Sequence, residues 1–370
     1  MAEQIFLDSF AKKFLRKAWQ TLVFLHVIAS RLTCGGGGTA RVFYGGARSG
    51  NLGGPLVKVK RLLEYFPQNR WKYNLIYLLS NAPYLSLFAL KLISNKNIPT
   101  VLNQNGVFFP GWYGGDWKKM NLAMANSYHR ADYVFWQSNF CRRAADHFLG
   151  KRKGPGEILF NAVDTKIFKP ANSRPERPFT FLLTGRIDAH LTYRIETSLT
   201  GIKVARECGL DCRLLVAGWV HPYALDIAKQ LVHKLRLVDH VDFLGQYTQE
   251  IAPSVYQSAD AYIITKYLDP CPNTVLEAMA CGLPVLYSAS GGVPEQVGKD
   301  AGVGLPVEEN WEGPPIVPST DAIASGMLEI YAKSNKMSVA ARLRAENNFE
   351  ITHWVDRHAQ VFQMLLDTKC

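Results

Sequence analysis

The chain has 370 residues, of which 48% are apolar, enough for two domains with hydrophobic cores, and this composition argues against a disordered polypeptide. Its formal net charge is +11, so we expect anionic partners such as nucleotide sugars, pyrophosphate-linked molecules or anionic lipids. Nucleic acid is not an expected partner, because the basic residues are scattered and no nucleic-acid-binding motif occurs.

The seven cysteines have no paired spacing and no C-x-x-C motif, which argues against a zinc site and against a disulfide framework. A reducing, cytoplasmic compartment is the simpler interpretation. We expect no cleaved leader, since no clear cleavage site follows the apolar stretch Trp19–Ala29. No uncharged run reaches the roughly 18 residues of a membrane-spanning helix, so any membrane contact is expected to be peripheral, on the inner face.

Residues 4–32 are predicted to form one amphipathic helix. Its apolar positions recur every fourth residue, at Phe6, Phe10, Phe14, Ala18 and Leu22, and its basic side and flank carry Lys12, Lys13, Arg16 and Lys17. The helix could lie in a membrane interface with its basic residues toward anionic headgroups, or it could pack on the first domain. The glycine run within Cys34–Thr39 predicts a flexible linker, so residues 1–38 form a separate segment.

A first series of strands and helices follows this segment. Strands are predicted at Arg41–Gly46, 74–79, 100–102 and 133–136. Gly53 and Gly54 precede Pro55 at a predicted helix start, where they would let a ligand approach the backbone closely or simply form a tight turn. The third strand leads into a loop that contains Asn105 and four aromatic residues, Phe108, Phe109, Trp112 and Tyr113. These rings could stack on a sugar or an isoprenoid, or pack in the core.

The second series is more regular. Strands are predicted at 180–183, 213–217, 241–244 and 261–265, and helices at 196–208, 223–237 and 249–258. Apolar strands that alternate with helices imply a parallel sheet covered on both faces. Residues 171–178, rich in proline and charge, are the expected hinge before this series. Helices are also expected at 321–331 and 338–366.

The stretch Asp269–Gly298 is the most informative part of the sequence. Asn273 is predicted to cap a helix that runs from Thr274 to about Cys281, and the start of such a helix offers unpaired N–H groups to a phosphate. Glu277 lies one turn inside, where its carboxylate could reach a sugar hydroxyl. The simpler alternative is a capped strand-helix unit in which the acid only stabilises the helix dipole.

The two acids, seven residues apart, and the GGVPE sequence at 291–295 closely resemble the E-x(7)-E signature of glycosyltransferase family 4. The resemblance implies that Glu277 holds the ribose of a nucleotide and that Asp269, in place of the usual glutamate, approaches the donor sugar. It also implies that the backbone at Thr274 and Val275 takes the distal phosphate. Phe160–Pro170 resembles the NGVD segment of that family, with Ala162 in place of glycine.

The resemblance extends to the pair Gly185–Arg186, whose arginine would hold the donor diphosphate. A lysine usually joins it; Tyr193 stands at that place, and the adjacent Arg194 could substitute or be a solvated charge. Asn105 stands where many members have a histidine, which puts a histidine-based acid or base in doubt, since an amide does not titrate usefully.

The resemblance therefore implies a set of site residues. Those expected to act in the reaction are Arg186, Asp269, Asn105 and Glu277, and those expected to bind the donor are Gly53, Gly54, Gly185, Arg186, Arg194, Asn273, Thr274, Val275 and Glu277. No D-x-D pattern follows a predicted strand, so we expect neither a metal nor another cofactor.

The implied fold is GT-B, with two Rossmann-like α/β domains facing across a cleft and an extra N-terminal helix. Residues 39–172 would form the acceptor domain, with the helix 350–370 packing back on it, and residues 173–349 the donor domain. The implied function is retaining transfer of a sugar from a nucleotide-diphosphate sugar to a glycan or lipid-linked glycan.

Rival interpretations remain. A phosphorylase of this fold would need a pyridoxal lysine, and the sequence around Asp269 and Glu277 argues against an epimerase. A non-catalytic subunit that binds sugar nucleotides in a surface-glycan assembly stays open, because Asp269 and Asn105 depart from the family pattern.

Overall fold

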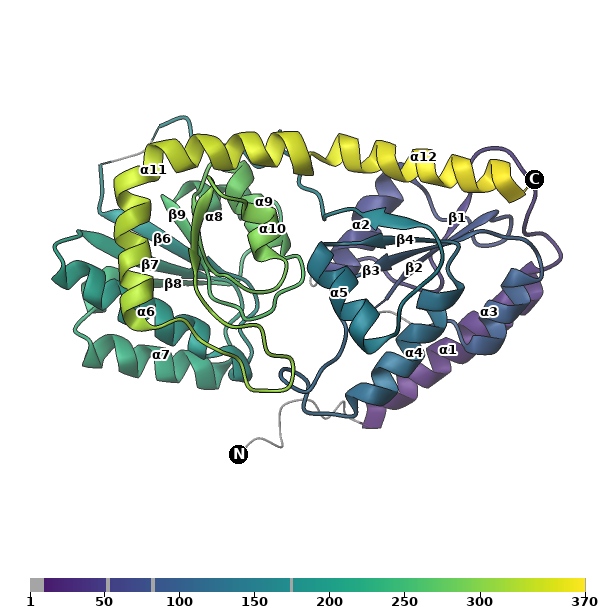
Figure 1. Cartoon of the computed structure of the whole chain (residues 1–370), viewed down its shortest axis with the longest axis horizontal. Helices are drawn as coiled ribbons and strands as arrows, with labels where there is room; N and C mark the ends of the chain where they lie inside the picture. The colour runs from purple at the N-terminus through teal and green to yellow at the C-terminus, as the bar shows by residue number, and fades with distance from the viewer. Residues whose placement is uncertain (1–9, 51–53, 81–83, 174–175, 370) are drawn as a thin grey trace. The chain divides into compact units, whose positions relative to one another are not determined.

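The computed structural model describes residues 10–50, 54–80, 84–173 and 176–369. Within these ranges the chain forms two compact α/β units (Figure 1). The first unit contains the described residues up to Phe160, together with Trp311–Gly313 and the residues from Thr352 onward. The second unit contains Asn161–Asn310 and Pro314–Ile351.

Five described strands form the parallel sheet of the first unit, in the order β1-β2-β3-β4-β5. They are β1 Val42–Phe43, β2 Leu75–Leu79, β3 Thr100–Gln104, β4 Tyr133–Trp136 and β5 Gly156–Ile158. Their helices are α2 Gly54–Tyr65, α3 Leu87–Ser94, α4 Trp117–Arg130 and α5 Asn139–Phe148. The predicted second, third and fourth strands are confirmed. The first is shorter than predicted, because Gly45 and Gly46 take positive φ values and turn the chain after Phe43.

The predicted N-terminal helix is confirmed over α1, Phe10–Ser30. One face of it packs on the first unit, with Val23, Val27 and Ser30 buried. The Trp19 indole N–H donates to the carbonyl of Gly46 at 2.9 Å, and the hydroxyls of Ser30 and Tyr73 lie 2.9 Å apart. The helix is therefore part of the fold of this unit, which favours the packed interpretation for this face.

The last helix, α12 Ile351–Lys369, packs its apolar face into the first unit (Figure 1). His358 is fully buried, and its Nε2 lies 2.9 Å from the hydroxyl of Tyr77. Burial lowers the pKa of His358 to about 3, so its imidazole is neutral. This single hydrogen-bonded histidine fixes the register of the helix on the sheet.

The boundary between the last two helices differs from the prediction. α11 runs without interruption from Thr320 to Phe349, and the break falls at Glu350. There the Val163 N–H donates to the carbonyl of Phe349, and the Ile351 N–H donates to the carbonyl of Val163. The Glu350 carboxylate also accepts from Thr165. Contacts with a remote segment, and not the local sequence, therefore end α11.

Six described strands form the parallel sheet of the second unit, in the order β11-β10-β9-β6-β7-β8. They are β6 Phe179–Thr184, β7 Cys212–Ala217, β8 Val241–Gly245, β9 Ala261–Ile264, β10 Val285–Ser288 and β11 Gly302–Leu305. The helices are α6 Tyr193–Glu207, α7 Pro222–Lys234, α8 Ala252–Gln257, α9 Asn273–Ala280, α10 Val293–Val297 and α11. The predicted strands are confirmed. The order reverses between β6 and β9, which is where open parallel sheets bind ligands.

Candidate functional site

The candidate site lies at the carboxyl edge of the second sheet, where β6 and β9 are neighbours. The two strands pair in parallel through Phe181 with Ala261 and Leu182 with Tyr262. The turn after β6 contains Gly185 and Arg186, and the loop after β9 leads through Asp269 to α9. Because parallel strands end at the same edge, the topology brings these two predicted segments together.

Helix α9 begins one residue earlier than predicted, and Asn273 is not its N-cap. Pro272, in an extended conformation, occupies the cap position, and no side chain among the described residues caps the helix. Asn273 is the first helical residue, and its buried Oδ1 has no hydrogen-bond partner in the described part of the chain. The N–H groups of the first turn, which include those of Thr274 and Val275, are thus left without a side-chain cap.

Glu277 lies one turn inside α9 and is half-buried. The hydroxyl of Tyr256, a fully buried residue of α8, donates to Glu277 Oε2 at 2.8 Å. Behind it, the hydroxyl of Tyr262 lies 3.1 Å from Thr184 Oγ1. Burial, and secondarily the charge of Glu277, holds the pKa of Tyr256 well above its ordinary value, so this tyrosine remains a donor. The network orients the Glu277 carboxylate from beneath.

Asp269 is only 7% exposed, and its Oδ2 lies 2.8 Å from Lys266 Nζ. The turn at Gly291 and Gly292 holds the loop closely: the Gly292 N–H donates to the carbonyl of Asp269 at 2.9 Å. Gly291 has a φ of 71°, and a Cβ there would lie 2.5 Å from the same carbonyl oxygen. The two glycines of GGVPE therefore position the loop that carries Asp269.

The two arginines differ in environment. The Arg186 side chain is 71% exposed, pairs with both oxygens of Asp188 at 2.9–3.1 Å, and lies 4.3 Å from the centre of the Trp219 ring. Its hydrogen bonds to Asp188 raise the pKa of Arg186. Arg194 is 3% exposed, and its Nη2 donates to the carbonyl of Thr184 at 3.1 Å.

Arg194 Nε is buried without a hydrogen-bond partner among the described residues. The alternative of a solvated charge at the helix start is therefore wrong for Arg194. A Cβ on Gly185 would lie 3.9 Å from Arg194 Nη1, so this guanidinium lies beside the turn after β6.

Three of the predicted site residues fall in the first unit. Gly53 lies outside the described residues, and Gly54 is the exposed first residue of α2. Asn105 follows β3, and its backbone N–H donates to Ser80 Oγ at 3.0 Å. In the aromatic loop, Phe108 stacks on Trp112 with 5.3 Å between ring centres. Phe109 is buried, which favours mutual packing as the role of these rings.

Two features of the site had no sequence signal. Lys266 was unremarkable in the sequence, yet it carries the cation nearest to Asp269 in the ion pair described above. Tyr256 lies 21 residues before Glu277 in a helix of its own, and only the fold brings the two together. No group of three or more histidine, cysteine or acidic side chains in the described ranges is placed to hold a metal ion. None of the described helices is long and apolar enough to cross a membrane.

Comparison with known proteins agrees with this site. Residues 164–313 match the family model described as "Glycosyl transferases group 1". The chain is 30% identical over 145 residues to a protein of the phosphatidylinositol N-acetylglucosaminyltransferase of Arabidopsis thaliana, a match that covers 39% of this chain and 31% of that protein. It is 34% identical over 146 residues to D-inositol 3-phosphate glycosyltransferase of Mycolicibacterium smegmatis, covering 38% and 34%. The chain thus matches about a third of the length of these relatives.

The fold is similar to solved structures over most of the chain. Anabaena HepE in complex with UDP superimposes with a TM-score of 0.63 at 18% identity, covering 84% of this chain and 82% of that one. Sucrose-phosphate synthase from Thermosynechococcus elongatus gives a TM-score of 0.62 at 19% identity, covering 80% and 75%. The two parallel-sheet α/β domains are those of the GT-B glycosyltransferases, as the sequence predicted.

Proposed function

We propose that this chain is a retaining, hexosyltransferase-type glycosyltransferase of family 4. It transfers a sugar from a nucleotide-diphosphate sugar to a hydroxyl of a glycan or lipid-linked glycan in the synthesis of surface polysaccharides or glycoconjugates. The observation that carries the proposal is Glu277, held by Tyr256 at the start of an uncapped helix beside the point where the strand order reverses. In this proposal residues 173–349 bind the donor, and residues 39–172, with the helix 350–370, bind the acceptor.

Donor binding would use complementary parts of α9. The Glu277 carboxylate accepts hydrogen bonds from paired ribose hydroxyls, and the N–H groups at Thr274 and Val275 hold the distal phosphate. The orphaned amide oxygen of Asn273 offers an acceptor to a donor hydroxyl. The bound UDP in the structure of Anabaena HepE supports a uridine nucleotide as the first donor to test.

Leaving-group stabilisation would fall to the two arginines. Arg186, exposed and paired with Asp188, can exchange that carboxylate for the donor diphosphate, while the buried Arg194 keeps a free Nε beside Gly185. Such fixed donors stabilise the developing diphosphate charge, so the proposed reaction needs neither metal nor cofactor. Asp269, held by Lys266, approaches the donor sugar, and Gly53, Gly54 and Asn105 complete the proposed site from the first unit.

The chemistry would be a substitution at the anomeric carbon. The bond from that carbon to the diphosphate oxygen breaks, and the acceptor oxygen bonds on the same face. The acceptor's proton passes to the departing diphosphate. No protein nucleophile is invoked.

The direct experiment is nucleotide release from a panel of donors by the purified chain, with and without glycan acceptors. We expect one nucleotide sugar to be consumed faster when an acceptor is present. Tight binding of a donor with no release under any acceptor would instead support the second candidate, a non-catalytic subunit. The ion pair between Asp269 and Lys266 is the observation that favours that candidate, because it occupies a carboxylate that transfer would use.

We also propose that the protein lies peripherally on the inner face of the membrane, where a lipid-linked acceptor would be available. The buried face of α1 leaves Phe14, Leu15, Leu22 and Leu25 exposed, beside the basic Arg16 and Lys17. The phosphatidylinositol in the name of the Arabidopsis relative supports a lipid-borne acceptor.

Flotation with anionic liposomes tests this membrane proposal without deleting a helix that the first unit needs. The wild type should float at low salt and less at high salt, because each basic residue near the surface contributes about 1 kcal/mol that salt screens. Leu15→Asp with Leu25→Asp should abolish flotation, whereas the same change at the exposed Leu122 of α4 should not. Equal flotation of both variants would contradict the proposal.

A further inference from the structure

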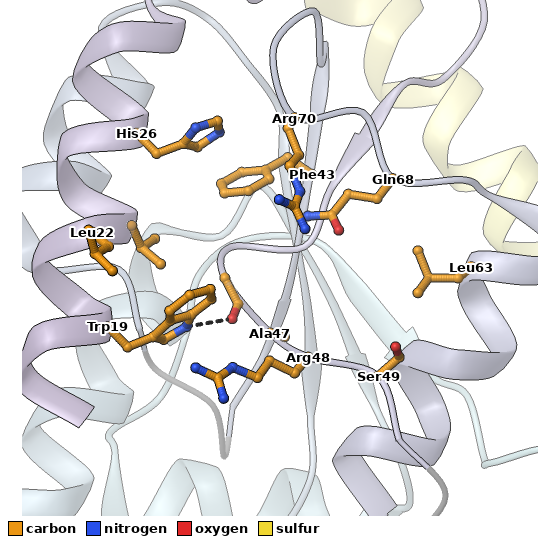
Figure 2. Close-up of a pocket in the computed structure, with 12 residues that line it drawn as sticks. Trp19, Leu22, His26, Phe43, Ala47, Arg48, Ser49, Leu63, Gln68 and Arg70 are labelled. Atoms are coloured by element: carbon orange, nitrogen blue, oxygen red, sulfur yellow. Dashed lines mark hydrogen bonds between the residues drawn. The ribbon is translucent and has the colours of Figure 1, made fainter. Parts of the chain in front are cut away.

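A cavity of about 350 Å³ lies within the first unit, between α1, the loop after β1 and the chain that follows α2 (Figure 2). Its volume falls within the range of sites that bind small molecules. Trp19 and Leu22 of α1 form one wall, Phe43 lies at the base, and Leu63 of α2 lies opposite. None of the residues assigned above to sugar transfer lines it.

The polar part of this pocket is cationic. Arg48 and Arg70 line it, and no carboxylate among the described residues does. Neither arginine has an acidic partner in the described part of the chain. The Arg48 guanidinium carbon lies 4.3 Å from the centre of the Trp19 ring, a stacked arrangement that leaves the N–H edges of the guanidinium available. An arginine fork of this kind suits phosphate oxygens, and two of them suit one phosphate group.

The apolar part is preformed. The Trp19 indole is held by its hydrogen bond to Gly46, and the buried Phe43 ring stacks on Tyr73 with 5.0 Å between centres. Leu22 lines the pocket and is 58% exposed, and Leu25 and Ile28 are exposed farther along the same helix. The pocket therefore opens beside an apolar strip, which would accommodate a hydrocarbon chain that is longer than the pocket itself.

His26 completes the environment without adding charge. Its ring lies between Phe43 and Trp71, at 5.2 and 4.8 Å between centres. Burial lowers the pKa of His26, and the neighbouring Arg70 acts in the same direction, so the imidazole is neutral at pH 7. The positive charge of the pocket thus comes from its two arginines.

We propose that this pocket binds one anionic amphiphile, with a phosphate head between Arg48 and Arg70 and an aliphatic or prenyl chain against Trp19, Leu22 and Leu63. The inference does not depend on the proposed sugar transfer, because it concerns other residues and its test is a binding measurement.

The experiment titrates the full-length protein with monodecyl phosphate, below the concentration at which it forms micelles, in a calorimeter. Inorganic phosphate and decyl maltoside are titrated in parallel, as a head without a chain and a chain without a charge. We expect saturable binding of one monodecyl phosphate per chain, and binding of the other two probes at least about tenfold weaker.

The variants Arg48→Gln and Arg70→Gln should each weaken the binding of monodecyl phosphate about tenfold or more. The matched control is Arg130→Gln, an exposed arginine in the last turn of α4 that does not line the pocket. Thermal unfolding should be similar for all three, since each replaced side chain is exposed.

Three results would overturn the proposal. Inorganic phosphate that binds as tightly as monodecyl phosphate would make this a site for a free anion. Decyl maltoside that binds equally would leave an apolar pocket without head-group recognition. An equal loss in Arg130→Gln would reduce the effect to the net charge of the protein. The first two comparisons use the wild type, so they remain decisive if a variant does not fold.

Discussion

The carboxyl edges of the two sheets carry polar side chains of different kinds. At the second sheet, charged groups are held in pairs, Arg186 with Asp188 and Lys266 with Asp269, and Arg186 remains largely exposed. At the first sheet, polar groups are buried and bound to one another. Asn103 Oδ1 accepts from Lys58 Nζ at 2.7 Å and from Gln137 Nε2 at 2.6 Å.

The difference shows how one architecture serves two purposes. Charged pairs near solvent can exchange a protein partner for a ligand at little cost, because water screens the intermediate states. A buried polar network cannot, since breaking one member leaves the others desolvated and unpaired. We therefore expect changes at the second edge to alter ligand binding and turnover, and changes at the first edge to alter stability.

The largest effect is expected at the arginines. Arg186→Ala should lower turnover about 100-fold, which corresponds to about 2.7 kcal/mol of transition-state stabilisation, as loss of one electrostatic donor does. Arg194→Ala serves as the comparison, measured as kcat/KM with thermal unfolding as a control. If turnover survives in Arg186→Ala and fails only in Arg194→Ala, the buried arginine carries the role assigned to Arg186.

A change in the first unit should act on stability instead. Asn103→Leu removes the acceptor of two buried donors, on Lys58 and Gln137, and should lower the free energy of unfolding by about 2–3 kcal/mol. Urea denaturation measures this loss, and calorimetry should show unchanged nucleotide affinity in the folded variant. A loss of nucleotide affinity without a loss of stability would break the proposed division between the two edges.

A smaller effect is expected from the residue that positions Glu277. Tyr256→Phe removes the hydroxyl that donates to Oε2 and should weaken nucleotide binding about tenfold, because hydrogen bonds to charged groups contribute about 1.5 kcal/mol or more. The matched control is Tyr73→Phe, a buried tyrosine whose hydroxyl pairs with Ser30 in the first unit. Equal nucleotide affinity in the two variants would show that Tyr256 only supports the core.

The smallest effect should be that of a chelator. Turnover is expected to persist in excess EDTA, because Arg186, Arg194 and the N–H groups of α9 supply the positive charge that the diphosphate needs. The assay is nucleotide release with and without the chelator, with added magnesium as the reversal. A strict requirement for a divalent metal would contradict the roles given to these groups.

The parts of the fold that the sequence predicted depend on local patterns. Apolar runs such as Leu75–Leu79 and Ala261–Ile264 are fully buried strands, and each lies between turn-forming residues. Glu277 could likewise be placed on a helix start, because Pro272, Asn273 and Gly282 delimit the helix within a few residues.

The parts that could not be predicted depend on contacts between remote segments. Asn273 has the residue type of an N-cap, but the fixed φ of Pro272 in an extended conformation places the cap one residue earlier. The break at Glu350 depends on hydrogen bonds with Val163, almost 190 residues away. Tyr256 and Lys266 have no distinctive spacing, and only the tertiary structure gives each a carboxylate partner.

The most direct test of the central claim, that the second unit binds a nucleotide through Glu277, is calorimetric titration of UDP. Glu277→Ala should weaken binding by about 1.5–3 kcal/mol, and Glu277→Gln by less, since an amide keeps one acceptor for the ribose. The matched control is Glu329→Ala, an exposed carboxylate on α11 that pairs only with the neighbouring turn of its helix in the described structure. Unchanged UDP affinity in a folded Glu277→Ala variant would contradict the assignment.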